Sequence, residues 1–160
     1  MLVVIGCGNL NRQDDGVGIR VIQQLQQQYP EAPEWLRLYD AGTAGMEVMF
    51  QARGCDTLIL IDACLSDSEP GAIFEVPGEE LESAPKDSFN LHDFRWDHAL
   101  YAGRQIFRED FPEHVRVFLI EAEHTGFGLE LSPRVAEAAT RVAETVQAHL
   151  SEYAKAHGLI

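Results

Sequence analysis

Two carboxylates and one imidazole stand at positions where they could share a metal ion. Asp15 ends a glycine-rich loop near the N-terminus, Asp62 directly follows an apolar run, and His92 lies in a polar stretch further along the chain. Together they would suit a borderline transition ion such as Ni²⁺ or Zn²⁺ and leave coordination positions open for water or a substrate. Other residues with the same chemistry compete with His92: Asp93, Asp97, His98 and His124.

Asp62 carries the strongest individual signal of the three. A carboxylate at the end of a buried apolar strand must be hydrated, paired or metal-bound, because its desolvation is otherwise costly. A hydrogen bond to the next loop is the structural alternative. For Asp14 and Asp15 the structural interpretation is a helix cap worth about 1 kcal/mol, with one aspartate capping and the other free to face a ligand.

Other kinds of site fit the sequence less well. Gly6 and Gly8 begin a G-x-G pattern, but the third glycine of a dinucleotide fingerprint would fall at Asn11, and no Gly-Lys-Ser/Thr follows. The three cysteines show no C-x-x-C spacing and are expected to be reduced thiols. A cysteine hydrolase that pairs Cys64 with His92 stays open as an alternative.

The elements that must position these residues can be predicted from the spacing of apolar residues. Short apolar runs predict strands at residues 2–5, 35–39, 57–61, 72–76 and 115–120. Apolar positions at helical spacing predict helices over 17–29, 46–52, 99–107 and 133–153, the last capped by Ser132 and Pro133, with 77–90 irregular. Strands that alternate with helices predict one α/β domain over residues 1–160. We expect three layers: a twisted, mostly parallel five-stranded sheet with helices on both faces. Ligands of such sheets bind beyond the carboxyl ends of the strands.

Composition narrows the classes of partner. With 12 basic and 26 acidic residues the formal net charge is -14, which would repel a nucleic acid backbone. The N-terminus has no basic segment and only a short apolar run, so we expect neither a signal peptide nor a membrane span. The sequence therefore predicts a cytoplasmic protein that binds neither nucleic acid nor membrane.

Four motifs in order along the chain resemble one known family. They are Gly6-x-Gly8-Asn9-x(5)-Asp15-Gly16-x-Gly18, then Asp40-x-Gly42-Thr43, then Asp62, then His92. Their order and spacing resemble those of the nickel-dependent hydrogenase maturation proteases over almost the whole chain. Four ordered motifs at predicted strand ends are far more specific than any single one.

The resemblance implies an endopeptidase that removes the C-terminal extension from the precursor of a [NiFe]-hydrogenase large subunit after nickel insertion. It implies that Asp15, Asp62 and His92 bind metal and carry the chemistry. The nickel would be supplied by the substrate and recognised there, while Zn or Cd could substitute in crystals. A free carboxylate could act as general base if burial raised its pKa. The residues implied in substrate binding are Gly8, Asn9, Asp40, Gly42 and Thr43.

Two stretches depart from the family pattern. Glu121-Ala-Glu-His124 replaces a segment that usually carries a proline, and Phe94-Arg-Trp-Asp-His-Ala-Leu-Tyr101 looks particular to this chain. These departures leave open which hydrogenase class is served and whether His98 or His124 modifies the site. A non-proteolytic nickel-binding or hydrogenase-docking accessory protein is the alternative function.

Overall fold

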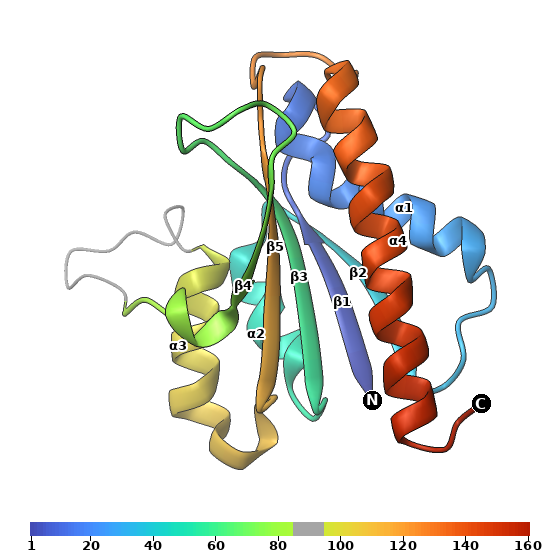
Figure 1. Ribbon diagram of the computed structural model, residues 1–160. Coiled ribbons are helices and arrows are strands. Elements are labelled where there is room, and N and C mark those ends of the chain that lie inside the picture. The colour runs from blue at the N-terminus through green and yellow to red at the C-terminus, as the bar shows by residue number, and fades with distance from the viewer. Residues whose placement is uncertain (85–94) are drawn as a thin grey trace.

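The computed structural model describes residues 1–84 and 95–160 and shows, within them, a five-stranded sheet between two layers of helices (Figure 1). The sheet order is β2-β1-β3-β5-β4. Its strands are β1 (Leu2–Cys7), β2 (Leu36–Gly42), β3 (Thr57–Cys64), β4 (Ile73–Pro77) and β5 (His114–Glu121). β2, β1, β3 and β5 run parallel, and β4 pairs antiparallel with β5 at the edge. The predicted fold class is confirmed.

The central strands owe their position to continuous apolar sequence. Every residue of β1 is buried, which suits a strand covered on both faces. Because side chains alternate along a strand, Leu2 and Val4 face one core, and Val3 and Ile5 face the other.

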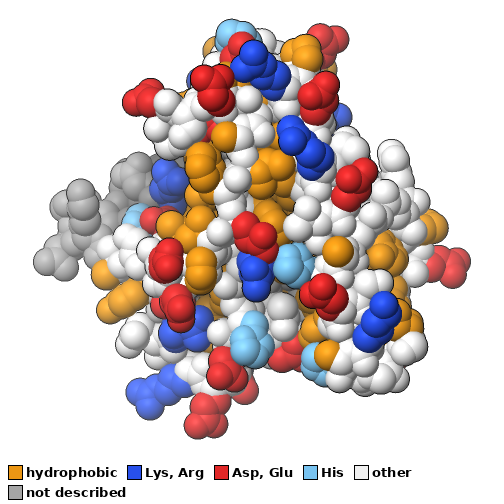
Figure 2. Space-filling view, in the orientation of Figure 1, with side chains coloured by type: hydrophobic (Ala, Val, Ile, Leu, Met, Phe, Trp, Pro, Cys, Tyr) orange, Lys and Arg blue, Asp and Glu red, His pale blue; other side chains and the backbone are white. Residues whose placement is uncertain are grey.

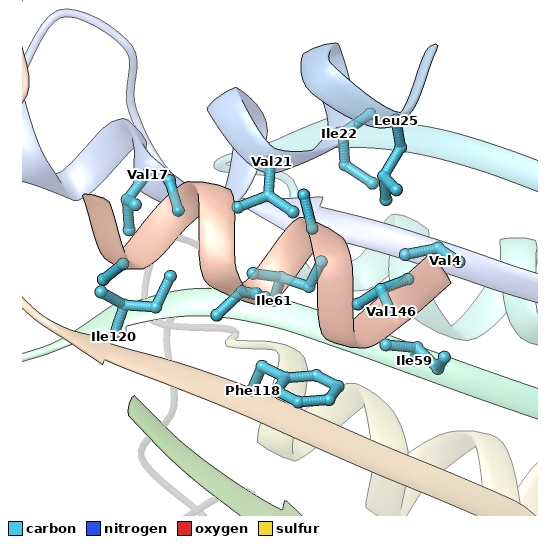
Figure 3. Packing of buried hydrophobic residues seen from close by; sticks show 14 of the residues in the cluster. Val4, Val17, Val21, Ile22, Leu25, Ile59, Ile61, Phe118, Ile120 and Val146 are labelled. Atoms are coloured by element: carbon cyan, nitrogen blue, oxygen red, sulfur yellow. The ribbon is translucent and has the colours of Figure 1, made fainter. Parts of the chain in front are cut away.

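Helices cover the two faces in pairs. α1 (Val17–Gln28) and α4 (Pro133–Ala156) pack on one face, and α2 (Gly45–Ala52) and α3 (Trp96–Phe107) pack on the other (Figure 1). Figure 3 shows side chains of α1 and α4 meeting those of β1, β3 and β5, with Val146 of α4 close to Ile59. The apolar stripes of the helices therefore bury both faces of the sheet.

Several boundaries differ from the predicted ones. β3 continues three residues beyond Ile61, because its pairing with β5 extends to the Cys64–Glu121 pair. Asp62 thus lies inside the strand rather than after it. α3 begins at Trp96, earlier than the predicted residue 99. A short 3-10 helix at Gly78–Glu80 lies in the stretch predicted to be irregular, and residues 85–90 of that stretch lie outside the described residues.

Acidic side chains are scattered over the face seen in Figure 2 and do not gather into one patch. None of the helices in residues 1–84 and 95–160 has the length and hydropathy needed to span a membrane.

A close backbone contact fixes the first helix on the sheet. A Cβ atom at Gly18 would lie 2.3 Å from the carbonyl oxygen of Ile61 and 2.6 Å from that of Cys7. Gly6 faces the same contact, since a Cβ there would lie 2.4 Å from the Gly18 carbonyl oxygen. Only glycine lets α1 lie this close to the ends of β1 and β3.

We expect Gly18→Ala to destabilise the protein by roughly 1–3 kcal/mol or more, because the added methyl group meets backbone atoms that cannot move away. Urea unfolding would measure the loss. Gly126→Ala is the matched control, since a Cβ at Gly126 meets no described heavy atom within 4 Å. Equal stabilities of the two variants would contradict the close-contact interpretation.

Candidate functional site

A cavity of about 610 Å³ lies at the carboxyl ends of β1, β2 and β3. This is where ligands bind in open parallel sheets. The structure brings together at this cavity these predicted site residues: Gly8, Asp15, Gly42, Thr43 and Asp62. Asn9 and Asp40 are not among the described lining residues. His92 lies outside the described residues, as does Asp93.

Asp62 is a partly buried carboxylate held by neighbours on both oxygens. The indole Nε1–H of Trp96 donates to Oδ2 at 2.8 Å, and the backbone N–H of Ala63 donates to Oδ1 at 2.8 Å. Burial raises the pKa of Asp62 to about 7, and the negative charge of Asp15 adds to the rise, although both hydrogen bonds oppose it. Near neutral pH this carboxylate can therefore either keep or release a proton.

Asp15 reaches the cavity because the first loop folds back on itself. Gly8 has a φ of 139°, and a Cβ there would lie 1.9 Å from the carbonyl oxygen of Asp15, so only glycine fits. The Asp15 carboxylate accepts a hydrogen bond from the backbone N–H of Asn9 at 3.1 Å. The prediction that Asp14 or Asp15 caps a helix is wrong, since neither the 3-10 helix Gln13–Gly16 nor α1 has a side-chain cap.

Asp14 has a structural role instead. Its buried carboxylate accepts hydrogen bonds from the backbone N–H groups of Glu123 and His124, both at 2.9 Å, and from the backbone N–H and hydroxyl of Ser132 at 2.7 and 2.8 Å. Burial raises the pKa of Asp14, but these hydrogen bonds outweigh it and hold the pKa below its usual value. Asp14 thus fastens the first loop to the loop between β5 and α4. Ser132 precedes α4 as predicted, but its hydroxyl binds Asp14 and does not cap the helix.

The predicted substrate-binding motif lies at the end of β2, because the strand runs to Gly42 and so includes Asp40, which was predicted to follow it. The carboxylate of Asp40 accepts the backbone N–H of Gly42 at 2.8 Å, and Gly42 adopts a φ of 53°. The Gly42 carbonyl in turn accepts the backbone N–H of Gly8 at 2.8 Å. The Asn9 side chain likewise binds within its own loop, to the backbone N–H of Asn11. Asp40 and Asn9 therefore shape the loops that present Gly8, Gly42 and Thr43 to the cavity.

The described surroundings of Cys64 argue against a thiolate nucleophile. Its thiol donates to the carboxylate of Glu121, with 3.1 Å between Sγ and Oε2. Burial and the neighbouring Glu121 raise the pKa of Cys64 to about 12, so the thiol stays protonated at neutral pH. Burial also raises the pKa of Glu121, but hydrogen bonds from Cys64, Ser66 and Ser68 outweigh it and bring that pKa to about 2.

The histidines that competed with His92 have structural partners or point elsewhere. Nδ1 of His98 accepts the backbone N–H of Arg95 at the start of α3. The His124 side chain is exposed beside Glu123, and its backbone binds Asp14. Neither histidine is among the described lining residues, whereas Asp97 is.

The described part of the chain supplies an incomplete ligand set for a metal ion. Asp15 and Asp62 bring carboxylate oxygens to the cavity, but residues 1–84 and 95–160 contain no group of three or more His, Cys, Asp or Glu side chains arranged to hold an ion. Asp15 and Asp62 can therefore contribute oxygens to a metal that also has ligands from elsewhere.

Trp96 is the site residue that the sequence analysis missed. It is buried, lines the cavity and holds Asp62 from 34 positions away. The one available signal was the unusual stretch from Phe94 to Tyr101, which marks a difference without assigning a role.

The raised pKa of Asp62 predicts a pH-dependent effect of Asp62→Asn on stability in metal-free protein. The folded state keeps the Asp62 proton up to about pH 7, whereas an unfolded aspartate loses it near its usual value of 3.8. The wild type therefore loses stability as the pH rises between these values, and the neutral asparagine does not. Urea unfolding should show the variant gaining up to about 3 kcal/mol on the wild type between pH 5 and pH 8. Parallel pH profiles would contradict the assignment.

Comparison with known proteins finds similarity to hydrogenase maturation proteases. Residues 19–149 match the family model described as hydrogenase maturation protease. The hydrogenase 2 maturation protease of Escherichia coli K12 is 29% identical over 152 residues, which cover 94% of this chain and 91% of that protein.

Solved structures of the same kind share the fold. The hydrogenase maturating endopeptidase HybD from E. coli superposes with a TM-score of 0.77 at 25% identity, covering 95% of this chain and 93% of that one. The solution structure of an endopeptidase from E. coli superposes with a TM-score of 0.78 at 27% identity over the same shares of the two chains.

Proposed function

Because the chain belongs to the hydrogenase maturation protease family, we propose that it removes the C-terminal extension from the precursor of a [NiFe]-hydrogenase large subunit once nickel has been inserted. It recognises the nickel that the precursor already carries. The observation that supports this most is the presence of Asp15 and Asp62 on one open cavity at the strand ends. Two carboxylates suit a cation brought in by a substrate that supplies the other ligands.

The chemistry assigned to Asp62 follows from its surroundings. In the metal-free protein burial raises the pKa of Asp62 to about 7, and its ionised carboxylate is proposed to accept the proton of an attacking water. The indole of Trp96 and the backbone N–H of Ala63 keep both carboxylate oxygens in one orientation. Nickel held by the substrate adds a positive charge that attracts Asp15 and Asp62 and fixes the register of the peptide. His92 is proposed as the third residue that contacts this metal.

The end of β2, with Thr43 directly after it, is proposed to receive the peptide next to the cleavage point. Gly8, Gly42 and Thr43 line the same cavity as Asp62. Glycine at two of these positions leaves room for a peptide backbone to approach closely. Asp40 and Asn9 act indirectly, by holding the loops in shape.

The decisive experiment mixes the purified protein with nickel-loaded and nickel-free forms of the cognate precursor and follows the precursor mass. We expect only the nickel-loaded form to lose its C-terminal extension. Asp62→Asn should lower the rate at least about 100-fold, because a general base contributes about 10²–10⁴. Equal clipping of both forms would contradict nickel recognition, and clipping of neither would favour the accessory-protein function.

The cysteine alternative is tested in the same assay. Cys64→Ser keeps a hydroxyl that can donate to Glu121 in place of the thiol. We expect this variant to retain clipping, whereas a cysteine hydrolase would lose it.

Trp96→Phe is expected to weaken binding of Zn²⁺ or Ni²⁺ to the isolated protein by about tenfold or more. The variant keeps an apolar ring but loses the N–H that holds Asp62, and residues supporting a metal ligand typically contribute 10–100-fold to affinity. Calorimetric titration measures the change. Trp35→Phe is the matched control, since Trp35 packs against Tyr153 and is not among the described cavity residues. Unchanged affinity in Trp96→Phe would rule out this role for the indole.

A further inference from the structure

Exposed apolar side chains stand on the two loops that border the cavity. Phe127 and Leu129, in the loop between β5 and α4, are 87% and 61% exposed, and Leu65, directly after β3, is 71% exposed. Leu65 itself lines the cavity, as does Thr125 two residues before Phe127. Single exposed apolar residues are ordinary on protein surfaces, so exposure alone assigns no role.

Hydrogen bonds join the loop that carries Phe127 to the loop that carries Asp15. The backbone N–H of Gln13 donates to the Gly128 carbonyl at 2.9 Å, and the Gly128 N–H donates to the Asn11 carbonyl at 2.9 Å. Nε of Arg12 donates to the Thr125 carbonyl at 3.1 Å, and its guanidinium lies 5.3 Å from the centre of the Phe127 ring. Phe127 is thus held out into solvent in a defined position.

Buried carboxylates anchor both loops from below. Asp14 binds the backbone of Glu123 and His124 at the start of the loop between β5 and α4. Glu121 binds the backbone N–H groups of Ser66 and Ser68, which lie one and three residues after Leu65. These charge-assisted hydrogen bonds hold the backbone of both loops beside the cavity.

From this geometry we infer that Phe127, Leu65 and Leu129 form a docking surface for the protein substrate at the mouth of the cavity. The inference rests on the proposed function for the identity of that substrate, the precursor of a hydrogenase large subunit. A protein whose nickel enters the cavity toward Asp15 and Asp62 must also approach the two loops that border it, since Leu65 and Thr125 of these loops line the cavity itself. The cavity carboxylates meet the metal, and the apolar rim meets apolar substrate surface around it.

The fixed position of these apolar side chains favours tight binding of the protein substrate. Large side chains fixed before binding lose little conformational entropy on association, and aromatic residues near the centre of an interface carry much of its energy. Phe127 is fixed by its loop and by Arg12, so it is the expected main anchor, with smaller contributions from Leu65 and Leu129.

A matched pair of variants tests the surface. Phe127→Ser should raise the Kd for nickel-loaded precursor, measured by biolayer interferometry, and the KM for its clipping at least about tenfold, with kcat little changed. Phe127→Tyr keeps the aromatic ring, so its Kd and KM should stay close to those of the wild type. Ile106→Ser is the control, because Ile106 is 63% exposed on α3 and is not among the described cavity residues.

The outcomes separate this inference from the proposed function. If Phe127→Ser and Ile106→Ser bind the precursor with equal affinity, the docking surface is overturned, whatever the clipping assay shows. A fall in kcat with unchanged KM and Kd also overturns it, since Phe127 would then act by placing Asp15. If the wild type binds the precursor through Phe127 but clips neither form, the docking surface stands and the proposed peptidase function fails.

Discussion

The contact between the first turn of α1 and the ends of β1 and β3 is the constraint on which the site depends. At Gly18 the helix backbone lies against the carbonyl groups of Cys7 and Ile61 with no room for a side chain. This contact sets the loop carrying Asp15 over the same strand ends that carry Asp62. The hydrogen bonds of Gly8 to Gly42 and of Asp14 to Ser132 then hold the rest of this loop in place.

Three acids near this cavity differ in what surrounds them, and the difference decides what each can do. Asp14 and Glu121 accept hydrogen bonds from backbone and hydroxyl groups that outweigh burial, so both have lowered pKa values and stay charged. Burial raises the pKa of Asp62 to about 7, with a further rise from the charge of Asp15, because the single hydrogen bond that each oxygen accepts among the described residues does not outweigh burial. The first two acids hold loops in place, and the third is free for proton transfer or metal contact.

The acids that hold the loops also connect the candidate site to the exposed apolar residues beside the cavity. The carboxylates that hold the loops also keep Leu65 and Phe127 exposed beside the cavity. The proposed peptidase function would benefit from such a preformed surface, because the geometry around the scissile bond is then set before the chemistry begins. Rigid loops and a partly buried reactive carboxylate are therefore parts of one arrangement.

Local sequence pattern was enough to predict the alternating α/β fold, the approximate strands and helices, and the carboxyl ends of the strands as the place where the cavity of the candidate site lies. The ordered glycine and aspartate motifs also identified the family. Tertiary structure alone distinguished Asp14 from its neighbour Asp15, since two adjacent aspartates look alike until Ser132, 118 positions away, binds one of them. It likewise revealed the hydrogen bond from Trp96 to Asp62, the hydrogen bond from Ser66 to Glu121, and the antiparallel pairing of β4 with β5. The physical reason is that periodicity reports which face of an element is buried, whereas hydrogen-bond partners distant in the chain are chosen by packing.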